Sequence, residues 1–267
     1  MRLRGDILER LYSRLNRRTH VHPDPLELLY RYRNPRDREI AALVASALAY
    51  GRVDGIVKSA SLVLDRLPRP ADVLSTMPEK DIPRMFPGFR HRFTDGCEIS
   101  SLLVGARRMI EEHGSLEQGF LRGYRGEHDT VVPALLAFST ALRSASGSGC
   151  ATLIPAPDKG SAMKRLCLFL RWMVRSDDVD PGGWTRIPVS KLVVPLDTHM
   201  HRIGGALGLT RRKQADMRTA VEITRGFARF RPEDPVRYDF ALTRLGIHGT
   251  LVGAMTRRSV MAALEEA

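Results

Sequence analysis

Cysteine is scarce in this sequence, and the spacing of the few present excludes several kinds of site. The chain has three cysteines, and no two of them form a Cys-x-x-Cys pair. An odd number without paired spacing supports neither a disulfide framework nor a four-cysteine zinc or iron–sulfur site. We therefore expect a protein of a reducing compartment that contains no metal and needs no cofactor.

Long apolar runs and nucleotide-binding loops are also missing. No stretch of about 18 uncharged apolar residues occurs, and residues 1–6 lead into a mixed helix rather than an apolar signal core. The chain has neither a GxxxxGK[ST] phosphate loop nor a GxGxxG fingerprint after a strand. These absences predict a cytoplasmic protein with no membrane partner, and they argue against nucleotide hydrolysis and hydride transfer.

Lysine is rare as well, and arginine supplies most of the positive charge. Only six of the 42 basic residues are lysines, and the 30 acidic residues leave a formal net charge of +12. Fixed cations displace the counterions condensed on a phosphate backbone, so this charge favours a polyanionic partner. The alternative is that arginine merely replaces lysine on solvated surfaces.

Helical patterns dominate what is present. Across the 267 residues helical periodicity occurs almost everywhere, whereas alternating apolar and polar runs are nearly absent. The expected fold class is therefore all-α, in one large domain or two small ones. Residues 35–50 and 161–175 each include a segment that is apolar on most sides, which predicts two buried helices. A further helix is expected over residues 95–113, ending at Gly114.

One break in composition divides the chain. At residues 144–160 Gly, Ser and Pro displace helix formers, which predicts a long loop or linker. In the helix that follows, Lys164, Arg171 and Arg175 lie within ~20° of one line. This stripe of cations could face a phosphate, or it could face only water.

Two acidic clusters have a superficial likeness to metal or acid–base sites. The acids within residues 177–180 are followed by Pro-Gly-Gly, which favours a solvated turn. Asp197, His199 and His201 form a D-x-H-x-H string. A helix would place Asp197 and His201 on one face and turn His199 away, so no metal site is expected.

Asp197 has two alternative roles at the start of a predicted helix. As an N-cap it would accept hydrogen bonds from the free N–H groups of the first turn. A helix N-terminus beside a groove also points its N–H groups at phosphates. A carboxylate there could instead stabilise positive charge that develops on a sugar carbon as its base is removed.

The surrounding residues resemble a known superfamily. Residues 195–209 (PLDTHMHRIGGALGL) resemble the Val-Asp-Thr-His-x-x-Arg-[Val/Ile] signature of the helix-hairpin-helix DNA glycosylases, whose familiar member is endonuclease III. Residues 39–50 are similar to that superfamily's buried early helix, residues 109–118 to the end of its six-helix subdomain, and residues 239–249 to its late histidine-glycine helix. Other segments resemble an uncharacterised bacterial family placed near this superfamily.

The resemblance implies an all-α fold of two helical subdomains with a cleft between them. It implies an N-terminal helical segment, a six-helix-type subdomain, a loop with the hairpin, a hairpin and catalytic helical region, and a C-terminal tail. These segments are expected at residues 1–34, 35–143, 144–160, 161–250 and 251–267.

The resemblance also implies roles for individual residues. Asp197 matches the catalytic aspartate, whose carboxylate supports loss of the base. Lys164 is the candidate nucleophile that attacks the sugar C1′ and forms a Schiff base, and Lys159 competes with it for this role. Arg171 and Arg175 would favour the neutral, nucleophilic form of Lys164 if they approach it.

DNA contacts are expected around the hairpin, the cation stripe and the first buried helix. Backbone N–H groups of the hairpin would hold a phosphate, and Tyr50 or Arg52 could fill the gap left by an extruded base, although Tyr50 could also be a core aromatic. We expect His248 and Trp172 to be interior residues. The expected DNA-binding residues are Pro157, Lys159, Gly160, Ser161, Arg171, Arg175, His199, Arg202, Tyr50 and Arg52.

The chain departs from the superfamily in its hairpin and in its C-terminal cysteines, among other features. Residues 154–160 (IPAPDKG) retain one glycine where the familiar hairpin has Leu-Pro-Gly-Val-Gly-x-Lys, and no cluster-ligating cysteines follow Gly249. The resemblance still implies a monomeric DNA-repair protein that acts as a base-excision N-glycosylase on damaged bases in double-stranded DNA, with AP-lyase activity if Lys164 is the nucleophile. The alternative is a non-catalytic nucleic-acid-binding protein on the same scaffold.

Overall fold

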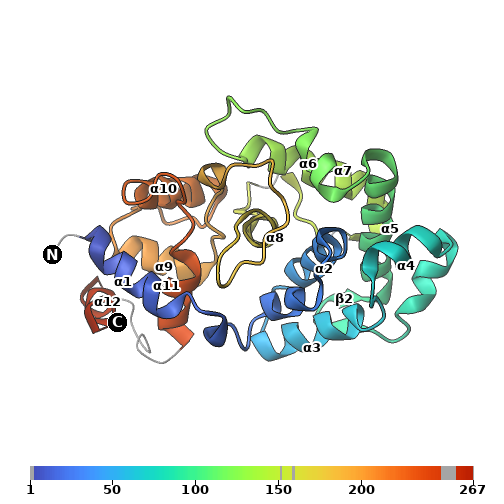
Figure 1. Ribbon diagram of the computed structural model, residues 1–267, viewed down its shortest axis with the longest axis horizontal. Helices are drawn as coiled ribbons and strands as arrows, with labels where there is room; N and C mark the ends of the chain where they lie inside the picture. The colour runs from blue at the N-terminus through green and yellow to red at the C-terminus, as the bar shows by residue number, and fades with distance from the viewer. Residues whose placement is uncertain (1–2, 151, 158–159, 248–256, 267) are drawn as a thin grey trace.

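The computed structural model describes residues 3–150, 152–157, 160–247 and 257–266 (Figure 1). The α-helices are α1 Gly5–Leu15, α2 Pro35–Ala47, α3 Val53–Leu64, α4 Pro70–Thr76, α5 Gly96–His113, α6 Leu116–Leu121, α7 Val132–Ser146, α8 Lys164–Val174, α9 Thr198–Ala206, α10 Met217–Ala228, α11 Asp239–Ile247 and α12 Arg257–Glu266. Strands β1 (Arg90–His91) and β2 (Thr94–Asp95) form a two-stranded antiparallel sheet. The prediction of an all-α fold is confirmed. Within the described ranges, no helix is both long enough and apolar enough to cross a membrane.

Local sequence signals set several helix ends. Helix α2 follows Asn34, whose side-chain oxygen accepts a hydrogen bond from the Arg36 N–H at 3.0 Å, and Pro35 occupies its first turn. Helix α5 starts after the N-cap Asp95 and ends at Gly114, which has a φ of 86°. A left-handed residue after a helix favours glycine because glycine has no Cβ to clash, so the predicted end at Gly114 is confirmed.

The core is centred on two helices that pack against each other. Figure 1 shows α8 in the middle of the molecule with α2 beside it, and the two are in contact. Every residue from 39 to 47 is buried, and so are residues 169–174. Phe169 of α8 stacks on Phe138 with ring centroids 6.1 Å apart and meets Trp184 edge-on at 5.1 Å. Both predicted buried helices are thus confirmed.

The beginning of the chain packs against its end. Helix α1 contacts α11 and α12, and Figure 1 shows all three at the same end of the molecule, away from α3, α4 and α5. Glu9 of α1 accepts hydrogen bonds from Arg231 at 2.9 Å and from the Tyr238 hydroxyl. Asp24 pairs with Arg244 of α11. The N-terminal segment is therefore fastened to the last third of the chain by charged groups.

Two arginines at the end of α8 are buried with aspartates in what we call the Arg–Asp cluster. Arg171 donates to Asp180 at 3.0 Å and to Asp239, and Arg175 also donates to Asp180. Asp180 is fully buried, and the two arginines are only 4% and 3% exposed. The other members of the cluster are Asp177 and Asp234, both partners of Arg175. The expected solvated turn at residues 177–180 is therefore wrong for two of its three acids, because the arginines draw Asp177 and Asp180 inward while Asp178 stays exposed.

Candidate functional site

Lys164 and Asp197 meet although 33 positions separate them in the sequence. Lys164 is the first residue of α8, and Asp197 is the N-cap of α9. The Lys164 Nζ lies 3.4 Å from Asp197 Oδ2, with 33% and 34% of the two side chains exposed. Two helix N-termini therefore present an amine and a carboxylate together, within reach of a ligand from solvent.

The carboxylate of Asp197 divides its two oxygens between two partners. Oδ1 accepts a hydrogen bond from the Met200 N–H at 2.8 Å, which is the expected N-cap contact. Oδ2 is the oxygen that faces Lys164. The capping role and the site role are therefore compatible, because the cap holds the carboxylate in the orientation that points Oδ2 at the amine.

A cavity of about 330 Å³ opens beside this pair. Its walls include Tyr50 from the loop between α2 and α3, Ser161 and Met163 from the segment before α8, and Lys164 itself. Met163 has a φ of 47°, an unusual conformation for a residue with a side chain, and it directly precedes the lysine. The cavity is comparable in size to small ligand pockets.

Arg165 is part of this site although the sequence did not single it out. Its guanidinium donates to the main-chain oxygen of Ala47 at 2.9 Å and of Thr152 at 2.7 Å, and it lies 5.4 Å from the Tyr50 ring centroid. Burial lowers the pKa of Arg165, while nearby Tyr50 and Glu98 oppose that change. The available signal was its place beside Lys164 at the start of a buried helix.

Tyr50 is half-buried and joins the cavity to the β1–β2 hairpin. Its hydroxyl donates to the main-chain oxygen of His91 at 3.0 Å and lies 2.8 Å from Thr94 Oγ1. Its ring meets the His91 ring edge-on at 4.8 Å. Tyr50 is thus neither an interior aromatic nor a free side chain, since it borders the cavity and anchors the hairpin.

The hairpin presents an aromatic residue that sequence reasoning missed. Phe93, at the turn between the strands, is 74% exposed, and the Arg92 guanidinium lies 5.6 Å from its ring centroid. Arg92 has a φ of 53° and approaches Gly51 so closely that a Cβ there would meet Arg92 Cδ at 2.8 Å. Two-residue strands are too short to show alternation, so only the string Arg-His-Arg-Phe at residues 90–93 could have indicated this feature.

The residues of the predicted DNA-binding hairpin, which precedes α8, border a neighbouring hollow of about 320 Å³. Pro157, Gly160 and Ser161 line it together with residues from the start of α10. Gly160 has a φ of 61°, and Ser161 forms an isolated bridge with Asp216. Lys159 and His248 lie outside the described residues.

The remaining predicted contacts lie on two helices. Arg52 is exposed at the start of α3, and Arg202 is exposed on α9. His199 is partly buried, and its Nε2 is buried without a hydrogen-bond partner in the described part of the chain. His201 Nε2 lies 2.8 Å from the main-chain oxygen of Arg212. Among the described residues no group of three or more His, Cys, Asp or Glu side chains is arranged to hold a metal ion.

The prediction that Arg171 and Arg175 contact DNA is wrong. Both guanidiniums are directed into the Arg–Asp cluster and neither is open to solvent, so they cannot reach a phosphate in this arrangement. The cluster nevertheless lies close to the candidate site. Burial raises the pKa of Asp239 to about 6 against the opposing charge of Arg171, and the negative charge of Asp197 adds to the rise.

Comparisons with known proteins place the chain in one family. A family model described as "Protein of unknown function (DUF2400)" matches residues 24–248, which include Lys164, Asp197 and the whole β1–β2 hairpin. No curated protein and no solved structure has a significant match to the chain.

Proposed function

The chain belongs to this family of proteins of unknown function, DUF2400, and we propose that it is a DNA-repair enzyme that removes a damaged base from duplex DNA. The observation that carries the proposal is the 3.4 Å approach of Lys164 Nζ to Asp197 Oδ2 at the edge of a cavity. The resemblance of residues 195–209 to the helix-hairpin-helix DNA glycosylase signature supports it, and with it a two-subdomain fold of that kind.

The pair supplies the two groups that such a reaction needs. As Asp197 takes a proton, the Lys164 amine attacks C1′ of the damaged nucleotide, and the bond from C1′ to the base breaks with its electron pair leaving on the base. Until it takes that proton, the ionised Asp197 also stabilises the positive charge that develops at C1′ as the base leaves. Opening of the sugar then leaves a Schiff base on Lys164, and β-elimination cleaves the strand on the 3′ side.

Features around the cavity support access to an extruded nucleotide. Phe93 is an exposed apolar group beside the basic Arg92, the type of side chain that proteins insert into a base stack to unstack it. Ser161 and Met163 bring main chain to the cavity at the start of α8, where N–H groups point outward and can hold a phosphate. The net charge of +12 favours DNA over an uncharged ligand.

Borohydride trapping tests the proposal. Wild type, Lys164→Ala, Asp197→Asn and Lys159→Ala would be incubated with duplexes that contain abasic, oxidised-purine or oxidised-pyrimidine sites. Lys213→Ala is the matched control, since Lys213 is an exposed lysine between α9 and α10. We expect a reduced covalent adduct for wild type, Lys159→Ala and Lys213→Ala, and none for Lys164→Ala. An adduct that survives Lys164→Ala would overturn the assignment of the nucleophile.

A second candidate, a non-catalytic nucleic-acid-binding protein, is favoured by one observation. Asp197 Oδ1 caps α9 through the Met200 N–H, so the residue has a sufficient structural role. Asp197→Asn separates the two functions because asparagine keeps the cap and removes the charge, at a cost of about 1 kcal/mol or less in stability. An enzyme would lose base release and keep DNA affinity. A binding protein would release no base on any duplex, before or after the substitution.

A further inference from the structure

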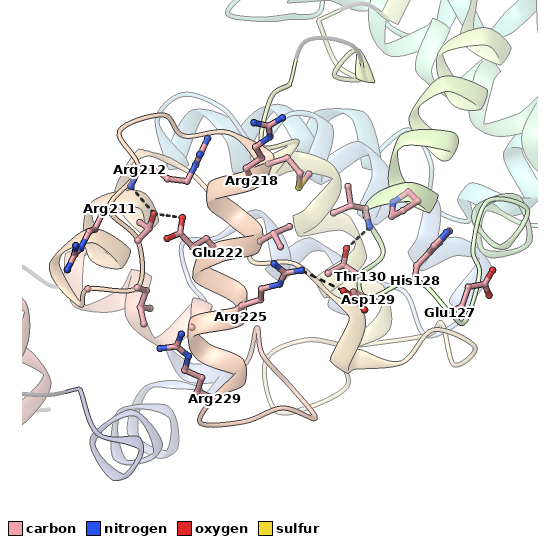
Figure 2. A pocket seen from close by; sticks show the side chains of 18 residues that line it. Glu127, His128, Asp129, Thr130, Arg211, Arg212, Arg218, Glu222, Arg225 and Arg229 are labelled. Atoms are coloured by element: carbon pink, nitrogen blue, oxygen red, sulfur yellow. Dashed lines mark hydrogen bonds and ion pairs between the residues drawn. The ribbon is translucent and has the colours of Figure 1, made fainter.

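A larger cavity, of about 1040 Å³, lies between α10 and the loop that precedes α7. Figure 2 shows Arg218, Arg225 and Arg229 along α10, Arg211 and Arg212 on the segment that precedes it, and Asp129 and Thr130 of the loop on the side to which Arg225 points. The arginines are Arg211, Arg212, Arg218, Arg225 and Arg229. Three acids share the lining, namely Glu127, Asp129 and Glu222, so the formal charge of the wall is positive.

Three of the arginines are aligned. Arg218, Arg225 and Arg229 are spaced by seven and then four residues along α10 and its end, which places them within ~20° of one line on a helix. At 1.5 Å of rise per residue the row spans roughly 16 Å. A linear row of this length matches an extended chain of phosphates better than it matches a single small anion, which needs converging groups.

The charges of this row are largely available to a ligand. Arg218 and Arg229 are exposed, and neither has an ion-pair partner among the residues that the structure describes. Arg225 pairs with Asp129 at 3.6 Å, but the two side chains are 69% and 87% exposed. An exposed pair of this kind contributes little and is easily displaced. The row can therefore exchange water and one weak partner for phosphate oxygens.

The cavity neighbours the candidate active site through residues that line more than one hollow. Arg218 and Met217 line both this cavity and the 320 Å³ hollow beside Gly160. Ser161 lines both that hollow and the cavity next to Lys164. A path of adjoining hollows thus leads from the amine of Lys164, past Ser161 and Arg218, to the arginine row.

We propose that the arginine row of Arg218, Arg225 and Arg229 binds the phosphodiester backbone of the strand whose nucleotide enters the Lys164 cavity, a role that rests on the proposed function. Arginine forms bidentate hydrogen bonds to phosphate, and such contacts fix the register of a strand without selecting its sequence. The row would extend the footprint of the protein beyond the damaged nucleotide and raise its affinity for long DNA.

The test compares a triple variant, Arg218→Ala, Arg225→Ala and Arg229→Ala, which we call the cleft variant, with a control that also loses three positive charges. The control is Arg69→Ala, Lys80→Ala and Arg84→Ala, three exposed residues that precede or follow α4 at the other end of the molecule. Fluorescence anisotropy would measure binding to abasic-site duplexes of about 10 and about 30 base pairs, and trapping would be run at saturating DNA. Both variants alter exposed side chains, and thermal melts would check that they fold.

We expect the cleft variant to lose about tenfold or more in affinity for the long duplex and little for the short one. Each lost phosphate contact should reduce the slope of log K against log salt by about 0.9, so the change should reach two to three for the row. The control should keep most of the affinity and the wild-type slope, and adduct formation at saturation should not change in either variant.

Other outcomes separate the two proposals. Equal losses in the cleft variant and the control, or an unchanged slope in the cleft variant, would overturn the arginine row as a backbone site while the adduct leaves the proposed enzyme intact. A wild type that forms no adduct, but whose salt-sensitive binding to long DNA disappears in the cleft variant, would overturn the enzyme and support the row. Inorganic pyrophosphate would be added as a competitor of the labelled long duplex. If it displaces that duplex as effectively as unlabelled long duplex does, the site is one for a small anion and the inference is wrong.

Discussion

Asp239 is a buried carboxylate whose negative charge is only partly compensated by its partners. It pairs with Arg171, but Asp180 shares the same guanidinium, and Asp197 adds further negative charge nearby. Four carboxylates face two guanidiniums in the Arg–Asp cluster, so the cluster carries excess negative charge inside the protein. Burial of a charge is costly unless its partners compensate it fully.

The pKa of Asp239 gives the first prediction. It is raised by burial from 3.8 to about 6, so between these values the folded protein binds more protons than the unfolded chain. Asp239 therefore favours folding most below pH ~4, and this contribution is lost as the pH rises through about 6. Asp239→Asn removes the titration and keeps an oxygen for Arg171, so wild type should lose stability relative to this variant over that window.

Urea unfolding of both proteins at several values between pH 4 and 7.5 would measure the difference. Asp178→Asn, which changes an exposed aspartate in the neighbouring turn, is the control and should follow wild type at every pH. Parallel stability profiles for wild type and Asp239→Asn would show that Asp239 is charged throughout.

The β1–β2 hairpin is the element on which the proposed DNA distortion depends. Phe93 projects from its turn, and the Tyr50 hydroxyl holds the strands in place. We predict that Phe93→Ala weakens binding to a damaged duplex severalfold and reduces unstacking beside the lesion, because the inserted side chain is lost. Fluorescence of a 2-aminopurine base next to the lesion reports the unstacking directly.

Leu62→Ala is the matched control, since Leu62 is another exposed large apolar side chain, at 44%, on α3. Both substitutions alter exposed positions and should change stability by about 0.5 kcal/mol or less. Equal 2-aminopurine signals for the two variants would remove Phe93 from the DNA interface.

The helices differ in how far the sequence could predict them. Helices α2 and α8 were identifiable because a helix that is apolar on most sides is expected to be buried. The β1–β2 hairpin could not be identified from the sequence, since strands of two residues have no periodicity to detect. The Arg–Asp cluster escaped prediction for another reason. Arg171 and Arg175 have the spacing of a solvent-facing stripe, and their true partners come from residues up to 68 positions away.

The pairing of Lys164 with Asp197 was expected only through the resemblance, because no local pattern links residues from two different helices. The 3.4 Å approach now gives that pairing a geometry. By contrast, Arg165 and the arginine row had no sequence signal beyond composition. An arginine in an arginine-rich chain becomes informative only when its neighbours in space are known.

At the scale of the whole molecule, α1 depends on contacts with distant residues. Glu9 binds Arg231, Arg237 at 3.2 Å and the Tyr238 hydroxyl. Burial opposes its charge, but the hydrogen bonds from Arg231 and Tyr238 lower the pKa of Glu9 overall. Glu9 thus stabilises the fold at neutral pH, and this stabilisation is lost as the pH falls through its folded-state pKa.

We predict that Glu9→Ala lowers the free energy of unfolding at pH 7 by about 1–3 kcal/mol, because it removes several hydrogen bonds to charged and phenolic groups. Asp6→Ala on the same helix is the control, since its pair with Arg4 is exposed to solvent and contributes little to stability. Urea unfolding at pH 7 and pH 3.5 measures both. A Glu9→Ala cost that is equal at the two pH values would contradict the role assigned to its charge.

The position of α1 also bears on how the protein is made. Its partners Arg231 and Tyr238 follow Glu9 by 222 and 229 residues, so at ordinary translation rates they leave the ribosome on the order of 10–40 s later. During that interval Ile7, Leu8 and Leu11, which are buried in the finished fold, have no partner from α11 or α12 to cover them. Helix α1 is therefore synthesised well before the elements that cover it, and a nascent chain stalled before residue 231 would expose the apolar face of α1 to chaperones and proteases.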